Sequence, residues 1–298
     1  MAAKVIRARV YGYCMGVRRA VETAVAEARA GNPGDVFTMG PLIHNPQALE
    51  SLRELGVGVL DERSLPDRLD GSTVVIRAHG VPPSLVATLA SRGARVVDAT
   101  CPRVRLSQRR AASFSEQGYA VFLAGEREHG EVVGVAAYAK DCIVVATSAE
   151  ARSAAERLAA SAGGVKTALI GQTTLTAEEY AAIAREIERF FPTLEKIDSI
   201  CPATVDRQKS LDELCAETDA VVVVGGRSSA NTRRLYSAAV ERGKPAWHVE
   251  SPDELPADLG AFAVVGLTAG ASTPDDVIDA VEARILSLSR IEQKSTIS

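Results

Sequence analysis

The chain has 298 residues, which is long for one hydrophobic core and predicts two or three domains of roughly 100–150 residues each. Apolar residues make up 46 % and charged residues 24 %, an ordinary balance for a globular protein. The net charge of −4 at pH 7 excludes a general electrostatic attraction to nucleic acid. The apolar runs are far shorter than the about 20 residues that cross a bilayer, so no membrane association is expected.

The amino terminus leads directly into a strand-like segment and lacks the charged-then-apolar plan of a signal peptide. We therefore expect a cytoplasmic protein. In that reducing compartment, the five cysteines are more often metal ligands, nucleophiles or buried thiols than disulfides.

Short apolar runs alternate with alanine-rich helical stretches along the chain, beginning with a strand-like run at 5–11 and a helical stripe at 16–30. The later strand-like runs lie at 73–77, 94–97, 120–123, 165–170, 220–224 and 261–265. They are nearly continuous in Val, Ile, Leu and Ala, as expected of parallel strands covered on both faces. The alternation predicts an α/β fold with mostly parallel sheets. The polar tail at 289–298 has no periodicity, and we expect it to be disordered.

Polar motifs recur at a shared distance from three cysteines, Cys14, Cys101 and Cys201. A first motif begins 28 to 30 residues after each cysteine, at His44, His129 and Ser229. A second lies 65 to 71 residues after each, at His79, Gln172 and Ser272. Nearly every motif follows an apolar run and precedes a helical one, the position at which open α/β sheets bind ligands.

This spacing predicts three similar α/β units around a pseudo-threefold axis, with their strand ends directed at one central cavity. The first unit would span 14–101, the second 102–197, and the third 1–13 together with 198–288. Regular βα units also produce regular spacing by themselves, but that alternative does not explain why a cysteine recurs at each origin.

Each of the three cysteines ends a strand-like segment and precedes a helix, where free N–H groups stabilise a thiolate. Structural zinc sites and redox dithiols usually contain close cysteine pairs, and this chain has none. An iron–sulfur cluster tolerates long spacing between its ligands. Three protein ligands leave one iron of a cubane open, which a Lewis-acid catalyst requires. The other two, Cys142 and Cys215, are interpreted as buried small hydrophobes.

Three of the four histidines lie in the motifs, and His248 is interpreted as structural. Neutral polar residues accompany the motif histidines; they include Asn45, Thr173, Thr174, Ser228, Ser229, Asn231 and Ser272. Histidine, hydroxyl and amide donors at strand ends can bind a diphosphate without a Walker loop. The chain has no nucleotide-binding glycine motif, so a nucleotide cofactor is not indicated.

Glu131, two residues after His129, is the candidate proton donor. An anionic ligand and a cluster nearby would raise the pKa of its carboxyl and let it carry a proton at neutral pH. The alternative is a surface glutamate stabilised by a helix dipole. Asp98 is interpreted as a brace for the loop that carries Cys101.

In chain order the motifs are Gly-Tyr-Cys-Met-Gly-Val at 12–17, His-Asn at 44–45, Ala-His-Gly at 78–80, Asp-Ala-Thr-Cys-Pro at 98–102, His-Gly-Glu-Val at 129–132, Gln-Thr-Thr-Leu at 172–175, Ile-Cys-Pro-Ala-Thr at 200–204 and Thr-Ala-Gly-Ala-Ser at 268–272. This ordered set resembles the 4-hydroxy-3-methylbut-2-enyl diphosphate reductase family, also called IspH/LytB. The resemblance covers the chain except its tail.

The resemblance implies the last step of the methylerythritol phosphate route to isoprenoids, in which an allylic diphosphate loses its hydroxyl and yields isopentenyl and dimethylallyl diphosphate. It implies one central 4Fe-4S cluster on Cys14, Cys101 and Cys201, whose open iron binds the substrate hydroxyl. Glu131 would relay the proton, with Thr173 near the hydroxyl. The diphosphate shell would consist of His44, His79, His129, Ser229, Asn231 and Ser272. A low-potential donor, ferredoxin or flavodoxin, and a monomeric state are expected.

Three positions depart from the family pattern. Ala230 replaces a second serine, Pro202 follows the third cysteine where other residues are common, and Gly130 replaces a frequent proline. The residues alone leave three alternatives open: a non-catalytic iron–sulfur electron carrier, a zinc-dependent hydrolase of phosphorylated compounds, and a family member with a shifted substrate, which Ala230 keeps open.

Overall fold

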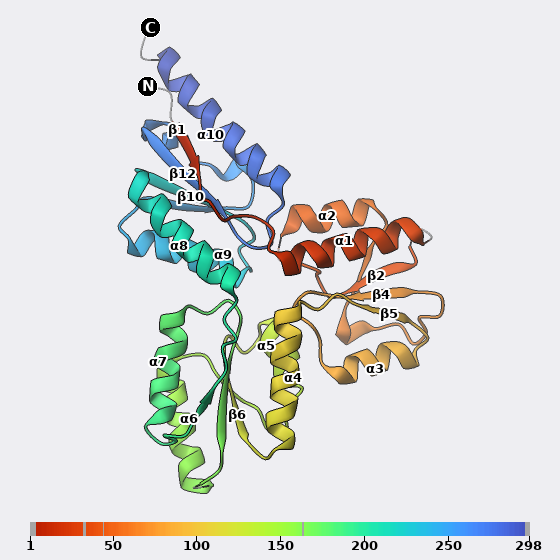
Figure 1. Ribbon diagram of the computed structural model, residues 1–298. Coiled ribbons are helices and arrows are strands. Elements are labelled where there is room, and N and C mark those ends of the chain that lie inside the picture. The colour runs from red at the N-terminus through yellow and green to blue at the C-terminus, as the bar shows by residue number, and fades with distance from the viewer. Residues whose placement is uncertain (1–3, 32–33, 44, 163, 296–298) are drawn as a thin grey trace. The chain divides into compact units, whose positions relative to one another are not determined.

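The computed structural model describes residues 4–31, 34–43, 45–162 and 164–295. The chain forms two compact units, each built from separate segments. The first unit consists of Met1–Arg18, Ile43–Glu54 and Val205–Ser298, and the second of Arg19–Leu42 and Leu55–Thr204. In the described part of the chain there are three four-stranded sheets, and every strand pair in them is parallel (Figure 1).

The second unit holds two of these sheets. One has the order β3-β2-β4-β5 and consists of β2 (Val36–Met39), β3 (Gly58–Leu60), β4 (Thr73–Ile76) and β5 (Arg95–Asp98). The other has the order β7-β6-β8-β9 and consists of β6 (Ala120–Ala124), β7 (Ile143–Val145), β8 (Thr167–Gly171) and β9 (Glu195–Lys196). The accompanying helices are α3 (Pro83–Ser91), α4 (Pro102–Glu116), α5 (Gly130–Ala136), α6 (Ser148–Ser161), α7 (Ala177–Glu188) and the short 3-10 helix Glu62–Ser64.

The first unit holds the sheet β1-β12-β10-β11, made of β1 (Lys4–Arg7), β10 (Ala220–Val224), β11 (Ala246–Val249) and β12 (Val264–Ala269). Its helices are α2 (Pro46–Glu54), α9 (Ala230–Glu241), α10 (Asp275–Ser295) and the 3-10 turns Pro252–Glu254 and Ala257–Ala261. Two further helices, α1 (Met15–Ala30) and α8 (Pro202–Glu217), begin in one unit and end in the other.

The three sheets share one strand order. Numbered along the chain, the strands of β3-β2-β4-β5 and of β7-β6-β8-β9 both lie in the order 2-1-3-4. The remaining sheet repeats this order when β10 is taken as its first strand, and the amino-terminal strand β1 then occupies the fourth place. The predicted α/β class with parallel sheets is thereby confirmed. The domain bounds predicted from the sequence stay a prediction.

Alternating side chains of the strands fill cores on both faces of the sheets around β6 and β10. In the sheet around β6, Phe122 and Leu169 pack with α6 and α7, whereas Leu123 and Ile170 pack with α4 and α5. Figure 1 shows these helix pairs on opposite faces of the sheet. Because helices cover both faces, side chains pointing either way are buried, which explains the uninterrupted apolar runs. Full burial of one such side chain contributes roughly 1.5–3 kcal/mol.

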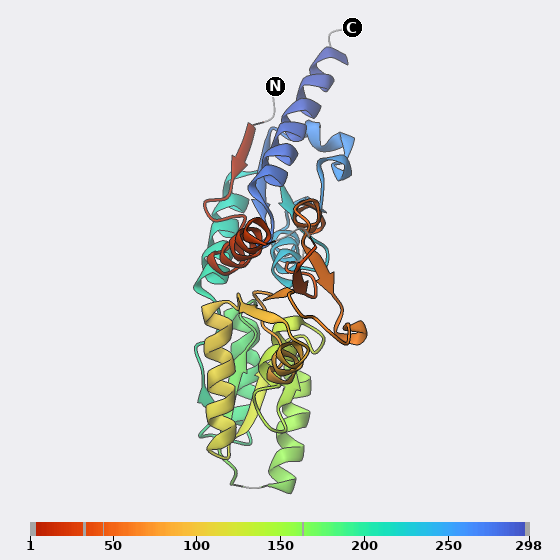
Figure 2. The same ribbon diagram turned by 90° about the vertical axis from the view of Figure 1, so that its right-hand side faces the viewer.

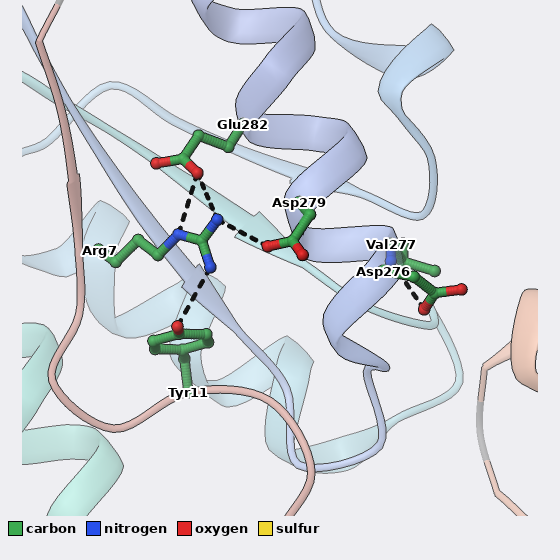
Figure 3. Close-up of polar contacts among 6 residues, drawn as sticks. All are labelled: Arg7, Tyr11, Asp276, Val277, Asp279 and Glu282. Carbon is green, nitrogen blue, oxygen red and sulfur yellow. Dashed lines mark hydrogen bonds and ion pairs between the residues drawn. The ribbon is translucent and has the colours of Figure 1, made fainter.

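The amino-terminal strand is bound to the rest of the first unit by side chains as well as by its pairing with β12. Arg7 forms an ion pair with Glu282 of α10, and its Nη2 lies 2.7 Å from Oδ1 of Asp279 (Figure 3). Its Nη1 donates to the hydroxyl of Tyr11 at 3.2 Å. These contacts hold β1 at the edge of a sheet whose other strands come from the far end of the chain.

The carboxyl-terminal segment differs from the expectation of a disordered tail over 289–298. Helix α10 continues to Ser295, and 296–298 lie outside the described residues; Figure 2 shows the helix along its length. The sequence after Asp275 contains no glycine or proline, and an established helix propagates through such residues at little cost. None of the helices in the described ranges is both long enough and apolar enough to span a bilayer.

Candidate functional site

Glu131 is a buried carboxylate held by two donors from one residue. It lies in the first turn of α5 and is 2 % exposed. One carboxylate oxygen accepts the backbone N–H of Thr173 at 2.7 Å, and the other accepts the Thr173 hydroxyl at 2.7 Å. The alternative of a surface glutamate is therefore wrong. Two donors from one residue fix the orientation of the carboxylate.

Gln172 ties together the two strand-end loops that carry this pair. Its Oε1 accepts the N–H of Glu126 at 3.0 Å in the loop after β6, and its Nε2 donates to the Thr174 hydroxyl at 2.7 Å in the loop after β8. Gly125 has a φ of 156°, and a Cβ there would lie 2.7 Å from Oε1 of Gln172. The loops after the first and third strands are thus braced at the position where the strand order reverses.

His79 and His129 lie together in the second unit. Their rings are 5.1 Å apart between centroids, in an edge-to-face arrangement at 71°. His129 caps α5, and its Nδ1 accepts the N–H of Glu131 at 3.2 Å. An accepting Nδ1 leaves Nε2 as the protonated nitrogen and therefore as a donor for an anion.

One backbone hydrogen bond recurs at all three predicted cysteine ligands. The N–H of Cys101 donates to the carbonyl of Ala78 at 3.0 Å, and that of Cys201 to the carbonyl of Thr173 at 3.0 Å. The N–H of Cys14 donates to the carbonyl of Ala271 at 3.1 Å. In each sheet the accepting residue is the second one after the third strand, β4, β8 or β12. The shared spacing in the sequence therefore corresponds to an equivalent local structure.

The loop of Cys101 is braced by Asp98, as the sequence predicted. Oδ1 of Asp98 accepts the N–H of Thr100 at 2.8 Å, and its other oxygen pairs with Arg105 at 2.5 Å. Burial by itself would raise the pKa of Asp98, but the hydrogen bonds from Thr100 and the guanidinium of Arg105 outweigh it and hold the pKa below its ordinary value. Cys101 itself is the amino-terminal cap of α4, and Pro102 takes the first helical position.

Cys14 lies in a separately braced turn of the first unit. The N–H of Val17 points to its Sγ at 3.5 Å. Arg207 donates to the carbonyl of Gly12 at 2.5 Å, and Gly12 has a φ of 68°, a backbone conformation that favours glycine. The neighbouring Tyr13 has its pKa raised to about 12, chiefly by burial.

Buried polar side chains of the first unit include amide donors without a partner. The Nδ2 of Asn231 and the Nδ2 of Asn45 are both inaccessible, and neither has a hydrogen-bond partner in the described part of the chain. The hydroxyl of Ser229 caps α9 by accepting the N–H of Thr232 at 3.3 Å, and Ser272 is 6 % exposed. An unpaired buried amide costs roughly 1–3 kcal/mol, so a polar ligand would offset this cost.

Arg77 is a residue of this region that the sequence reasoning missed. Its guanidinium packs against Gly130, where a Cβ would lie 3.0 Å from Nη2, and against Gly40, where a Cβ would lie 2.7 Å from Nη1. Its Nε is buried and has no partner among the described residues. Burial lowers the pKa of Arg77 from its ordinary value, and Glu62 partly offsets this. The position directly before the Ala-His-Gly motif was the only signal in the sequence.

The remaining predicted residues divide as follows. His44 lies outside the described residues. His248 is structural, since its Nε2 lies 2.7 Å from the carbonyl of Gly225. Cys215 is buried, as predicted, whereas Cys142 is only half-buried; burial raises the pKa of Cys142 to about 12.

The three predicted cluster ligands belong to different parts of the fold. Cys14 lies in the first unit, and Cys101 and Cys201 lie in the second. Within the described ranges, no three His, Cys, Asp or Glu side chains form a group that could hold a metal ion. The chemistry of the donor set nevertheless fits an iron–sulfur cluster, because three thiols at equivalent helix starts, none of them in a disulfide, are soft ligands, unlike the oxygen ligands that hard cations prefer.

Comparison with known proteins yields both curated relatives and solved structures. The 4-hydroxy-3-methylbut-2-enyl diphosphate reductase of Treponema denticola is 45 % identical over 285 residues, covering 94 % of this chain and 98 % of that relative. The protein of the same name from Aquifex aeolicus is 37 % identical, covering 94 % and 95 %.

Two solved structures have a similar fold. The Plasmodium falciparum E-1-hydroxy-2-methyl-but-2-enyl-4-diphosphate reductase has a TM-score of 0.84 at 26 % identity, covering 94 % of this chain and 86 % of that one. A structure described as (E)-4-hydroxy-3-methyl-but-2-enyl diphosphate reductase, the terminal enzyme of the non-mevalonate pathway, has a TM-score of 0.70 at 36 % identity, covering 96 % and 99 %. The model of the LytB protein family matches residues 5–286. The chain therefore belongs to the LytB family.

Proposed function

We propose that this chain is a 4-hydroxy-3-methylbut-2-enyl diphosphate reductase. The substrate's allylic C–O bond breaks, two electrons and two protons are taken up, and water leaves, so that isopentenyl or dimethylallyl diphosphate remains. The observation that carries the proposal is the Glu131–Thr173 pair. The Thr173 carbonyl accepts the N–H of Cys201, and this places the carboxylate in the same hydrogen-bonded loop system as a predicted cluster ligand.

Three cysteines, Cys14, Cys101 and Cys201, would hold one 4Fe-4S cluster. When bound, the cluster supplies the electrons and an open iron that acts as a Lewis acid toward the hydroxyl. The recurring N–H to carbonyl bond supports equivalent roles for the three residues, since each is fixed to the end of its sheet's third strand.

Glu131 would deliver a proton to the hydroxyl that leaves as water. Its burial excludes competing solvent protons, and the two hydrogen bonds from Thr173 hold it in one orientation. A positioned proton donor of this kind contributes typically about 10²–10⁴-fold to a rate. The Thr173 hydroxyl, already directed at this carboxylate, is also suited to orient the substrate hydroxyl.

The diphosphate would be bound by neutral and histidine donors. The set is His44, His79, His129, Ser229, Asn231 and Ser272. The unpartnered Nδ2 of Asn231 and the protonated Nε2 of His129 support this assignment. Ala230, at the first position of α9, is 2 % exposed. Its side chain has no hydroxyl, so it cannot donate a side-chain hydrogen bond to the diphosphate.

The proposal also includes a low-potential electron donor of the ferredoxin or flavodoxin class and a monomeric chain in the cytoplasm. Five cysteines, none of them in a disulfide, support a reducing compartment.

Anaerobic turnover of the hydroxylated diphosphate with chemically reduced methyl viologen tests the function, with Glu131→Gln as the critical variant. Glu128→Gln is the matched control, because Glu128 is exposed and only three residues away. We expect Glu131→Gln to lose at least about 100-fold in kcat with its cluster EPR signal intact, and Glu128→Gln to be unchanged. An iron-free protein after reconstitution, or an equal effect of both variants, would contradict the proposal. Undiminished electron transfer without any turnover would favour a simple carrier.

A further inference from the structure

Helix α4 differs in charge from the other two helices that follow a predicted cluster cysteine. It carries four arginines, and its one acidic residue, Glu116, is its last residue. Helices α1 and α8 carry both signs along their length. The chain as a whole has a net charge of −4, so the arginines of α4 form a local positive region on a negative protein.

Most of these arginines form no ion pair with the residues that the structure describes. Arg105 pairs with Asp98, but no ion pair is found for Arg103, Arg109 or Arg110 within the described residues. The helix packs on its sheet with Val104, Ala111 and Phe114 in the core. By helical spacing Arg109 lies on the outward side, and Arg103 and Arg110, seven residues apart, flank the packed side. Arg109 and Arg110 are exposed, and Arg103 is partly exposed. Guanidinium groups that stabilise no contact in the protein are available to a partner.

The positive region begins at a predicted cluster ligand. Cys101 caps α4, so Arg103 lies two residues beyond it. At a rise of about 1.5 Å per residue, Arg109 and Arg110 lie roughly 12–14 Å from Cys101 along the helix axis. Arg19 adds a fourth guanidinium near the start of α4. Its Nη1 donates to the carbonyl of Thr100 at 3.0 Å, and the residue is exposed. Figures 1 and 2 show α4 along the side of its sheet.

We propose that the basic face of α4, formed by Arg19, Arg103, Arg109 and Arg110, docks an acidic electron-transfer protein of the ferredoxin class. This inference rests on the proposed function, which requires electrons to be delivered close to the three cysteines. Arginine binds carboxylates in a bidentate manner, and complementary charge accelerates and orients association. Attraction between exposed charges is screened by salt, so the interaction should weaken as ionic strength rises.

Binding is the first test and does not depend on turnover. A plant-type 2Fe-2S ferredoxin is titrated into the anaerobically reconstituted protein by isothermal calorimetry at low salt. The variant Arg103→Gln/Arg109→Gln/Arg110→Gln should raise Kd at least tenfold. The control Arg152→Gln/Arg157→Gln/Arg185→Gln, on α6 and α7, removes the same charge from exposed sites and should leave Kd within twofold.

Turnover with two reductants then separates this inference from the proposed function. The α4 variant should lose most of its ferredoxin-driven turnover and keep its methyl-viologen-driven turnover. Failure of the unsubstituted protein to bind ferredoxin, an unchanged Kd in the α4 variant, or equal weakening in the control would overturn the docking surface. Absence of methyl-viologen-driven turnover in the unsubstituted protein would overturn the proposed reductase function. The binding measurement would still test the docking surface independently.

Discussion

Thr173 uses all of its backbone and side-chain polar groups at once. Its N–H and hydroxyl hold the carboxylate of Glu131, and its carbonyl accepts both the N–H of Cys201 and the hydroxyl of Thr204, the latter at 3.1 Å. One residue therefore couples the orientation of the candidate proton donor to the loop of a predicted metal ligand. A hydrogen bond to a charged group is worth about 1.5–3 kcal/mol, so this coupling is strong enough to fix one arrangement.

Asp98 supplies a prediction about pH at the same scale. Its pKa is lower in the folded protein than in the unfolded chain, so the stability it contributes is complete above the unfolded value of about 3.9 and is lost as the pH falls through the folded value. Asp98→Asn should therefore lower the Tm of the apoprotein most at neutral pH, with a difference that shrinks as the pH falls from 5 toward 2.

Thermal unfolding followed by circular dichroism between pH 7 and pH 2 measures this. Asp67→Asn is the control, because Asp67 is exposed and makes no comparable contact with any residue that the structure describes. Parallel Tm curves for Asp98→Asn and the unsubstituted protein would contradict the bracing role.

The start of α5 shows how two elements constrain each other. Alanine at a helical position is ordinarily about 0.5–1 kcal/mol more stable than glycine. At Gly130, however, the added Cβ would meet the guanidinium of Arg77, which is itself largely enclosed. We therefore expect Gly130→Ala to destabilise the protein by about 1–3 kcal/mol, the usual range for overpacking.

A double-mutant cycle tests this expectation. In an Arg77→Ala background the obstruction is gone, so Gly130→Ala should become neutral or stabilising. The free energy of unfolding from urea titration gives the coupling. The same loss of stability from Gly130→Ala in both backgrounds would show that Arg77 is not the cause.

At the scale of the whole molecule, the amino-terminal strand β1 pairs with β12, a strand from the carboxyl-terminal part of the chain. Lys4–Arg7 form the fourth strand of a sheet whose other three strands begin at Ala220. Removing residues 1–7 should leave β12 as an edge strand that pairs only with β10, and should remove the ion pairs of Arg7 with α10.

Hydrogen exchange followed by mass spectrometry checks this prediction. Amides of β12 and α10 should lose protection by at least tenfold, whereas those of β6 and β8, in the other unit, should not change. Arg7→Gln keeps the strand and removes the ion pairs together with the hydrogen bond to Tyr11, so it should show a smaller effect, centred on α10. Uniform loss of protection over both units would mean that β1 is not a local element of one sheet.

The resemblance to the reductase family, stated from ordered motifs, is confirmed by family membership, and the α/β class is confirmed by the three parallel sheets. Both were accessible because each motif is local: an apolar strand, a short polar loop and a helix start can be read within a dozen residues. The helical structure of the carboxyl-terminal segment was harder to predict, because the segment is polar. It nevertheless contains no glycine or proline to end helix α10 before Ser295.

The sequence by itself determined the alternation of strands and helices, the three equivalent cysteines and the order of the polar motifs, because these follow from local periodicity and spacing. Only the tertiary structure decided that Glu131 is buried and bound to Thr173, 42 residues away, and that Arg77 lies against Gly130. A glutamate near a helix start has the same local pattern whether it faces solvent or a second loop. The difference comes from which strand ends the parallel sheet brings side by side, and that depends on long-range packing.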